Sequence, residues 1–138
     1  MLRRERLLVR TPGRGFLALT ARVQETVARL APEADGLVHL FCRHTSCALV
    51  ITENADPDVR ADLERLARRW APDGDPAYAH RLEGPDDMAA HGRSVLTGCE
   101  LAVPLERGRL LLGTWQGIFL WEHRTQPHAR EIVLTVLG

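Results

Sequence analysis

The stretch LLLGTWQGIFLWEH, residues 110–123, decides the fold of this chain. From residue 110 to residue 121 it is almost continuously apolar, which is typical of a strand that is buried on both faces. One small sheet with two helices does not readily cover both faces of such a strand. Packing of one sheet on another does so, and so does burial in an oligomer. The stretch therefore predicts a strand that is covered on both faces, either by a second sheet or by another copy of the chain.

Six further segments have the apolar and β-branched composition of strands and are bounded by turn residues. They are residues 5–10, 16–19, 36–43, 45–52, 100–105 and 130–137. Most of their connections are short, and the turn ERGR at residues 106–109 favours a hairpin because it contains glycine. About seven mainly antiparallel strands with two main helices predict an α+β fold.

Two helices are expected from the spacing of apolar residues. In the first, Thr20 is the expected cap, and Val23 and Val27 fall on one face. The second has the clearest start in the chain, because Asp56 can cap it and Pro57 occupies the first helical position. Its apolar residues share one face, which is therefore expected to lie on a sheet.

Length and composition predict one globular domain over residues 1–138. Hydrophobic residues make up 45% and charged residues 26%, the balance of a folded protein rather than a disordered one. Eighteen basic and eighteen acidic residues cancel, so no long-range field favours nucleic acid or an anionic membrane as a partner. The chain contains no lysine, which excludes a Schiff-base mechanism on a lysine.

The three cysteines, Cys42, Cys47 and Cys99, lack the C-x-x-C spacing of zinc ribbons and redox motifs. Their odd number favours a reducing compartment. The first residues carry charges but no apolar run of signal-peptide length, and no segment approaches the roughly 18 apolar residues of a membrane span. We therefore expect a cytoplasmic protein with no membrane partner.

The first candidate site is the stretch AHRLEGPDDMAAHG at residues 79–92. Gly84 and Pro85 can open a short helix with Pro85 at its first position, which places Asp87 and His91 four residues apart on one face. The alternative is that the acids only stabilise the positive end of the helix and that His91 is solvated. The stretch is nevertheless dense in the N and O donors that suit Zn²⁺ or a similar ion, namely His80, Glu83, Asp86, Asp87 and His91.

A second candidate is RHTSCALVITEN at residues 43–54. If this segment is extended, His44 lies at one end and Asn54 at the other, roughly 30 Å apart by strand geometry. They are then too distant for one compact site within a chain, although different neighbours or subunits could bring them together. Alternation also places Cys47 on the face opposite His44, so we interpret Cys47 as a core residue.

The third candidate is GTWQGIFLWEHR at residues 113–124. Gln116 and Glu122 fall on one face of the expected strand, where either a polar network or an open site must satisfy them. Trp115 and Trp121 fall on the other face and are expected to pack in the core. His123 lies at the end of the strand. The sequence favours neither a role as a ligand nor a position in solvent for this residue.

Common catalytic motifs are missing from the chain. It has no G-x-S-x-G elbow, P-loop, Rossmann fingerprint, H-E-x-x-H or EF-hand pattern. The polar residues of the three candidate stretches are therefore the basis for any catalytic interpretation.

In these same three stretches the chain resembles the YjbQ family of small bacterial and archaeal proteins. The matching motifs are RHTSCALVITENADPDVRADL, HRLEGPDDMAAH and GTWQGIFLWEHR, which follow the expected order along nearly the whole chain. The resemblance implies an α+β sandwich that assembles as a homotrimer through its sheets. Arg81 stands where relatives usually carry asparagine, and it offers a fork for a phosphate.

The resemblance also implies an activity, since members of the family are often described as secondary thiamine-phosphate synthases. That reaction joins an aminopyrimidine diphosphate to a thiazole phosphate and releases pyrophosphate, so the expected partner is a phosphorylated small molecule with a divalent metal, Zn or Mg. His80 and His91 would hold the metal, completed by His44 or His123. The expected catalytic residues are Glu83, Asp87, Glu122 and Gln116, of which Glu83, Asp87 or Glu122 would serve as a base or orient a metal ligand. The expected substrate contacts are Thr45, Ser46, Asn54, Arg81 and Arg124.

Two other functions fit the same residues. In one, the chain is a non-catalytic binding or assembly module whose polar cluster satisfies buried groups between subunits. In the other, it is a hydrolase that uses metal-bound water on a phosphorylated small molecule. Metal content and product analysis distinguish the three.

Overall fold

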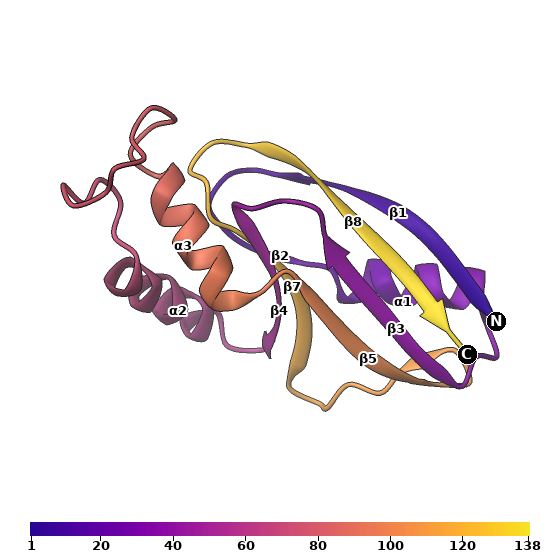
Figure 1. Cartoon of the computed structure of the whole chain (residues 1–138). Coiled ribbons are helices and arrows are strands. Elements are labelled where there is room, and N and C mark those ends of the chain that lie inside the picture. Colours follow the sequence, from indigo (N-terminus) through magenta and orange to yellow (C-terminus); the bar gives the residue numbers. More distant parts are fainter.

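Two antiparallel sheets pack face to face in the computed structural model, which describes residues 1–138 (Figure 1). The larger sheet has the strand order β1-β8-β3-β5-β6, and the smaller has the order β2-β7-β4. The strands are β1 (Leu2–Thr11), β2 (Gly15–Ala18), β3 (Gly36–Cys42), β4 (Cys47–Glu53), β5 (Glu100–Glu106), β6 (Arg109–Leu110), β7 (Gln116–Glu122) and β8 (His128–Leu137).

Three helices complete the α+β fold: α1 (Thr20–Leu30), α2 (Pro57–Trp70) and α3 (Asp87–Thr97). Helices α2 and α3 lie together at one end of the molecule, and both chain termini lie at the other end (Figure 1). The predicted class is confirmed, with eight strands where about seven were expected and with α3 in the place of the short helix expected beside the two main ones. None of the helices has the length and apolar character that a membrane crossing requires.

Strand β7 is buried on both faces, as the opening stretch predicts. Ile118 and Leu120 point into the core between the sheets, and Trp121 points the other way, against Ala67 of α2. Sheet-on-sheet packing covers one face of the strand and a helix covers the other. Burial in an oligomer is therefore not needed to explain the apolar run.

The expected long strand is interrupted before β7. Residues 111–115 form a connection in which the Gly113 N–H donates to Gln116 Oε1 at 2.8 Å, while the Gln116 N–H donates back to the Gly113 carbonyl at 3.1 Å. Because of this turn, the side chain of Trp115 points outward and the residue is 64% exposed. The prediction that Trp115 packs in the core is therefore wrong, whereas that for Trp121 is confirmed.

The helix starts follow the expected signals only in part. Asp56 caps α2, since its carboxylate accepts the N–H of Asp58 at 2.9 Å. Thr20 does not cap α1; its hydroxyl instead accepts the N–H of Ile118 at 2.9 Å, which ties the helix to β7. Helix α3 begins at Asp87, later than the expected start at Pro85.

The hairpin predicted at residues 106–109 joins β5 and β6. Arg107 and Gly108 both have positive φ, 47° and 73°, as a two-residue hairpin turn with the matching twist requires. A side chain at Gly108 would meet the carbonyl oxygen of Pro32 at 2.3 Å. Glycine is therefore needed here for both conformation and space.

One face of the larger sheet has no cover within the chain. Side chains that alternate with the buried Leu7, Val38 and Leu40 point to this outer face. Among them are five exposed large apolar residues, Leu2, Leu8, Leu37, Phe41 and Leu137. An apolar sheet face of this kind is typical of a surface that another protein chain covers.

Replacing Leu120 by alanine tests the sandwich core. Leu120 is fully buried between the sheets, so Leu120→Ala is expected to lower the free energy of unfolding by about 2–5 kcal/mol, measured by urea denaturation. The matched control is Leu111→Ala in the exposed connection, expected to change it by about 0.5 kcal/mol or less. Equal losses in both variants would contradict the assignment of β7 to the core.

Candidate functional site

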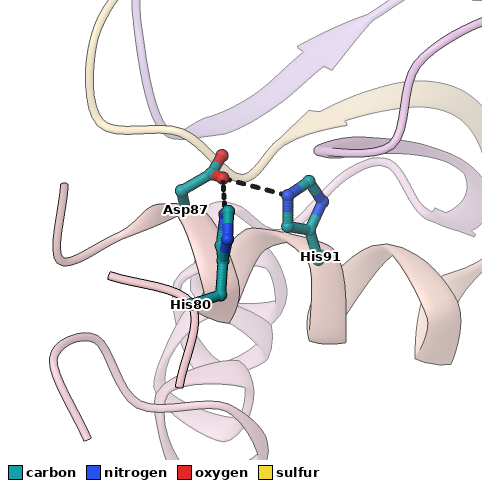
Figure 2. A group of neighbouring side chains, drawn as sticks. All are labelled: His80, Asp87 and His91. Atoms are coloured by element: carbon teal, nitrogen blue, oxygen red, sulfur yellow. Dashed lines mark hydrogen bonds and ion pairs between the residues drawn. The ribbon is translucent and has the colours of Figure 1, made fainter. Parts of the chain in front are cut away.

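Three side chains from the 79–92 stretch converge beside the start of α3 (Figure 2). Asp87 is the first residue of the helix, His91 lies one turn later, and His80 reaches in from the connection that follows α2. The Nε2 atoms of His80 and His91 lie 2.7 and 3.0 Å from the same oxygen, Asp87 Oδ2. All three possible ligand atoms fall within 4.8 Å of one another, the only such group of three in the chain.

The orientation of His91 is set by a backbone contact from another part of the chain. Its Nδ1 lies 2.9 Å from the carbonyl oxygen of Thr45, so this nitrogen carries the proton and donates. In the neutral ring, Nε2 then presents a lone pair toward the Asp87 carboxylate. A cation between Nε2 and that carboxylate removes the repulsion between two electron-rich atoms, whether the cation is a proton or a metal ion.

Arg124 holds the acidic side of the group. Its Nη1 donates to Asp87 Oδ1 at 2.7 Å, its Nε to Asp86 Oδ2 at 2.9 Å, and its Nη2 to the Glu83 carbonyl at 3.0 Å. Asp86 Oδ2 also accepts the Thr125 N–H at 2.9 Å. Asp87 thus has one oxygen committed to Arg124 and the other available to the histidines.

These contacts keep both aspartates ionised. Burial by itself raises the pKa of Asp86, but the Thr125 N–H and the Arg124 guanidinium outweigh it and lower this pKa to about 2. For Asp87, burial is likewise outweighed by His80, His91 and Arg124, so its pKa lies below the ordinary value. The group is thus held in the anionic form that a cation requires.

Two imidazoles and one carboxylate are a donor set that suits Zn²⁺ or a related divalent ion. The donor bond from His91 Nδ1 to a carbonyl is the usual support for a metal-bound histidine. The His80 and His91 side chains are 42% and 32% exposed, so solvent reaches the group from one side. A cation held here would keep open positions for water or substrate.

A surface hollow of about 400 Å³ lies directly beside His80. Tyr78, Arg81 and Pro85 line it together with residues 74–76. The Arg81 guanidinium donates from Nε to the Tyr78 carbonyl and from Nη2 to the Pro76 carbonyl, both at 2.6 Å. These two bonds fix a positive charge at the edge of the hollow and leave Nη1 for a ligand.

A second polar network lies deeper, between the two sheets. Both oxygens of Glu122 accept from the guanidinium of Arg130, and Oε1 also accepts from the Thr11 hydroxyl at 2.7 Å. Arg130 Nη2 in turn donates to the carbonyl and the hydroxyl of Ser46. Burial by itself raises the pKa of Glu122, but the hydrogen bonds from Arg130 and Thr11 outweigh burial. The pKa therefore lies below its ordinary value, and the carboxylate is ionised. Glu122 and Ser46 therefore stabilise the fold, and Glu122 has no free oxygen for the predicted role as a base.

The other two predicted metal ligands do not reach the His80 group within one chain. His123 is fully buried; its Nε2 donates to the Thr97 hydroxyl at 3.3 Å, because that hydroxyl already donates to the Arg93 carbonyl. Burial, followed by the charge of Arg93, lowers the pKa of His123 to about 3, so the ring is neutral. His44 Nε2 accepts the backbone N–H of Glu131 at 2.8 Å and is occupied there.

Gln116 and Asn54 lie at the opposite end of the smaller sheet. In the pairing of β4 with β7, Cys47 faces Glu122 at one end and Glu53 faces Gln116 at the other. Asn54 donates to the Gln116 carbonyl at 3.2 Å, and Gln116 closes the turn before β7. Both residues therefore have local structural roles, remote from the candidate site.

The structure thus assembles part of the predicted site and reassigns some of its members. His80, Asp87, His91 and Arg124 come together, with Glu83 and Arg81 at the edge. Asp87, predicted as a base, completes the ligand group in place of His44 or His123. Thr45 takes part through its carbonyl rather than its hydroxyl, and Tyr78 was missed because nothing in the sequence marks a lining residue.

Comparison with known proteins places the chain among relatives. The family model described as UPF0047 protein YjbQ-like matches residues 5–138. The chain belongs to the YjbQ-like family. It is 46% identical over 125 residues to the UPF0047 protein YjbQ of Salmonella typhimurium, covering 91% of this chain and 90% of that protein. A UPF0047 protein of Synechocystis is 45% identical over 134 residues, with coverage of 97% and 90%.

Solved structures similar to this YjbQ-like chain confirm the fold. A conserved hypothetical protein of Thermus thermophilus has a TM-score of 0.86 at 41% identity, covering 96% of this chain and 99% of that one. A hypothetical protein of Aeropyrum pernix has a TM-score of 0.88 at 28% identity, with coverage of 99% and 98%. The sandwich described above is therefore the architecture of the family.

The low pKa of Asp86 predicts a specific loss of stability in acid. Its contribution is complete above about pH 4, the ordinary pKa of an unfolded aspartate, and disappears as the pH falls through about 2. Asp86→Asn is therefore expected to remove about 2 kcal/mol of the pH dependence of unfolding between about pH 4 and about pH 2. Urea denaturation across this range measures it, and the same slope in both proteins would contradict the charge pairing with Arg124.

Proposed function

We propose that this YjbQ-like protein holds a divalent metal ion, Zn or Mg, between His80, Asp87 and His91. The observation that carries the proposal is the convergence of two imidazole Nε2 atoms on one carboxylate oxygen. The neighbouring contacts fit a ligand group, since Thr45 sets the tautomer of His91 and Arg124 occupies the far oxygen of Asp87. Two nitrogen ligands favour Zn over Mg.

The hollow beside His80 is the proposed substrate pocket. Its volume of about 400 Å³ suits a small molecule, and Arg81 brings a positive charge to its edge. The anionic group expected there is a phosphate or pyrophosphate, because the remaining Nη1 of Arg81 can donate a charge-assisted hydrogen bond to such oxygens. Arg124 offers no second such donor, since all three of its nitrogens are engaged by Asp86, Asp87 and Glu83.

The reaction we assign is condensation of an aminopyrimidine diphosphate with a thiazole phosphate, releasing pyrophosphate, either as the evolved reaction or as a side activity of the site. A bound divalent ion would stabilise the negative charge that develops on the departing pyrophosphate. Arg81 would bind and orient that group. The thiazole nitrogen would attack through its lone pair and lose no proton, so this reaction gives the exposed carboxylate of Glu83 no proton to accept. Histidines 80 and 91 act only as ligands in this scheme.

The proposed assembly is a homotrimer in which the outer face of the larger sheet is covered by other copies. Its five exposed apolar side chains alternate with charged ones, among them Arg4, Arg6 and Glu131. Charges of both signs on one face allow one part of it to pair with a different part of the same face on the next copy, as the head-to-tail interfaces of a closed ring of three require. A second copy therefore matches both the apolar and the charged character of this face.

The metal and the reaction are tested together with single-histidine variants. His80→Ala and His91→Ala are each expected to weaken Zn²⁺ binding by roughly 100-fold or more and to abolish pyrophosphate release, because each removes one ligand of three. Calorimetric titration with Zn²⁺ and a pyrophosphate-release assay with the two phosphorylated substrates are the measurements. His128→Ala is the control, since this imidazole lies outside the ligand group and bonds only to the Gln126 carbonyl, and it should retain both properties.

Three outcomes of that experiment separate the candidate functions. Metal binding without turnover would favour the non-catalytic binding module, and hydrolysis of the diphosphate without condensation would favour the hydrolase. Unchanged Zn²⁺ affinity in both histidine variants would contradict the metal site itself.

Replacing Leu37 by glutamate tests the trimer. Leu37 lies on β3, the middle strand of the larger sheet, with its side chain on the outer face. A buried charge there is expected to reduce the mass in light scattering from that of three chains to that of one, 15.4 kDa. Leu66→Glu on the exposed side of α2 is the matched control and should leave the mass unchanged. A wild-type monomer would refute the assembly.

A further inference from the structure

Two thiols meet in the interior at the point where the chain passes from one sheet to the other. Cys42 is the last residue of β3 in the larger sheet, and Cys47 is the first of β4 in the smaller one. Both are buried, and their sulfur atoms lie 3.3 Å apart. The four residues between them, 43–46, form the loop that links the two strands.

We propose that Cys42 and Cys47 are an oxidisable dithiol that a small peroxide converts into a disulfide, and that this disulfide alters the candidate metal site through the loop between them. The first part stands on the sulfur geometry alone. The second part rests on the proposed function, because it concerns the metal affinity of His91 and its partners.

Of the two cysteines, Cys42 is the one that borders a surface depression. Cys42 lines an open surface depression with the exposed Cys99 and with Phe41, His44 and Thr45, whereas Cys47 lies behind it and is fully buried. In the proposed reaction, hydrogen peroxide approaches Cys42 from this depression. Oxidation is therefore expected to begin at Cys42 and to end at Cys47.

The environment of the two sulfurs supports the same order of events. The hydrogen bond between the two thiols, aided by the Arg130 charge, lowers the pKa of Cys42, while that bond and burial raise the pKa of Cys47. The thiolate is the form that attacks a peroxide. Cys42 is thus suited to be the attacking sulfur, with Cys47 as the thiol that resolves the product.

The proposed chemistry uses one peroxide for each disulfide. The Cys42 thiolate attacks one oxygen of hydrogen peroxide, the O–O bond breaks, and Cys42 becomes a sulfenic acid while the other oxygen leaves as hydroxide. The Cys47 sulfur then attacks the Cys42 sulfur, the S–O bond breaks, and hydroxide leaves again. Two thiols and one peroxide yield one disulfide and two waters, with both sulfurs oxidised and both peroxide oxygens reduced.

Closure of the disulfide reaches the candidate site because the loop between the cysteines supports it. The Thr45 carbonyl accepts the Nδ1 proton of His91, and the Ser46 carbonyl accepts the N–H of His123, the residue before Arg124. The sulfurs must move from 3.3 Å into covalent contact, and the ends of a four-residue loop move with them. A shift of the Thr45 carbonyl changes the orientation of His91 toward Asp87.

The test treats the reduced full-length protein with hydrogen peroxide and maps its disulfides. Trypsin cuts after Arg43, so Cys42 and Cys47 fall in separate peptides, residues 30–43 and 44–60, while Cys99 falls in residues 94–107. We expect an intact mass lower by about 2 Da, for two hydrogen atoms lost, and a non-reduced digest in which peptides 30–43 and 44–60 are linked. Cys99→Ser is the control and should form the same link.

A second variant keeps the proposal falsifiable if the core resists oxidation. Cys47→Ala removes the resolving thiol, so Cys42 should remain as a sulfenic acid that a dimedone reagent traps. Either of two results would overturn the dithiol assignment. One is a link that includes peptide 94–107. The other is a wild-type protein without a link, together with a Cys47→Ala variant in which Cys42 stays unmodified.

The effect on the metal site is read separately, by titrating Zn²⁺ into the reduced and the oxidised Cys99→Ser protein. A change in affinity of about 10-fold is expected, the size typical of losing the support of a metal-bound histidine. Equal affinities would overturn the coupling. Absence of Zn²⁺ binding in the reduced protein would overturn the proposed function, while the peptide map would still decide the disulfide.

Discussion

The buried ion pair between Glu122 and Arg130 is the interaction on which the functional end of this molecule depends. Glu122 belongs to the smaller sheet and Arg130 to the larger, so the pair joins the two layers. Thr11 and Ser46 satisfy the remaining polar atoms, which is the condition for a buried pair to be tolerated. Removing one partner alone would leave an uncompensated charge, at a cost of about 3–5 kcal/mol.

The candidate site is built outward from this pair. Two residues after Glu122, Arg124 leaves the sheet and binds Asp86 and Asp87 at the start of α3. One residue before Ser46, Thr45 turns its carbonyl to His91. The same junction of sheets therefore positions both Asp87 and His91, although no residue of the ligand group belongs to a strand.

Sequence reasoning was reliable where one element dictates the outcome. The apolar run around β7 predicted a strand buried on both faces, and Asp56 with Pro57 predicted the start of α2. It was less reliable where a side chain has competing partners. The Thr20 hydroxyl bonds to β7 instead of capping its own helix, and the turn at Gly113 exposes Trp115 within an otherwise apolar run.

The contrast is sharpest within the ligand group. The pairing of Asp87 with His91 follows from the sequence by itself, because helical geometry brings residues four apart onto one face. The approach of His80, the clamp from Arg124 and the contact of Cys42 with Cys47 were decided only by the tertiary structure. These contacts depend on the path of the connection after α2 and on how the two sheets pack. The spacing of apolar residues in the sequence predicts neither of them.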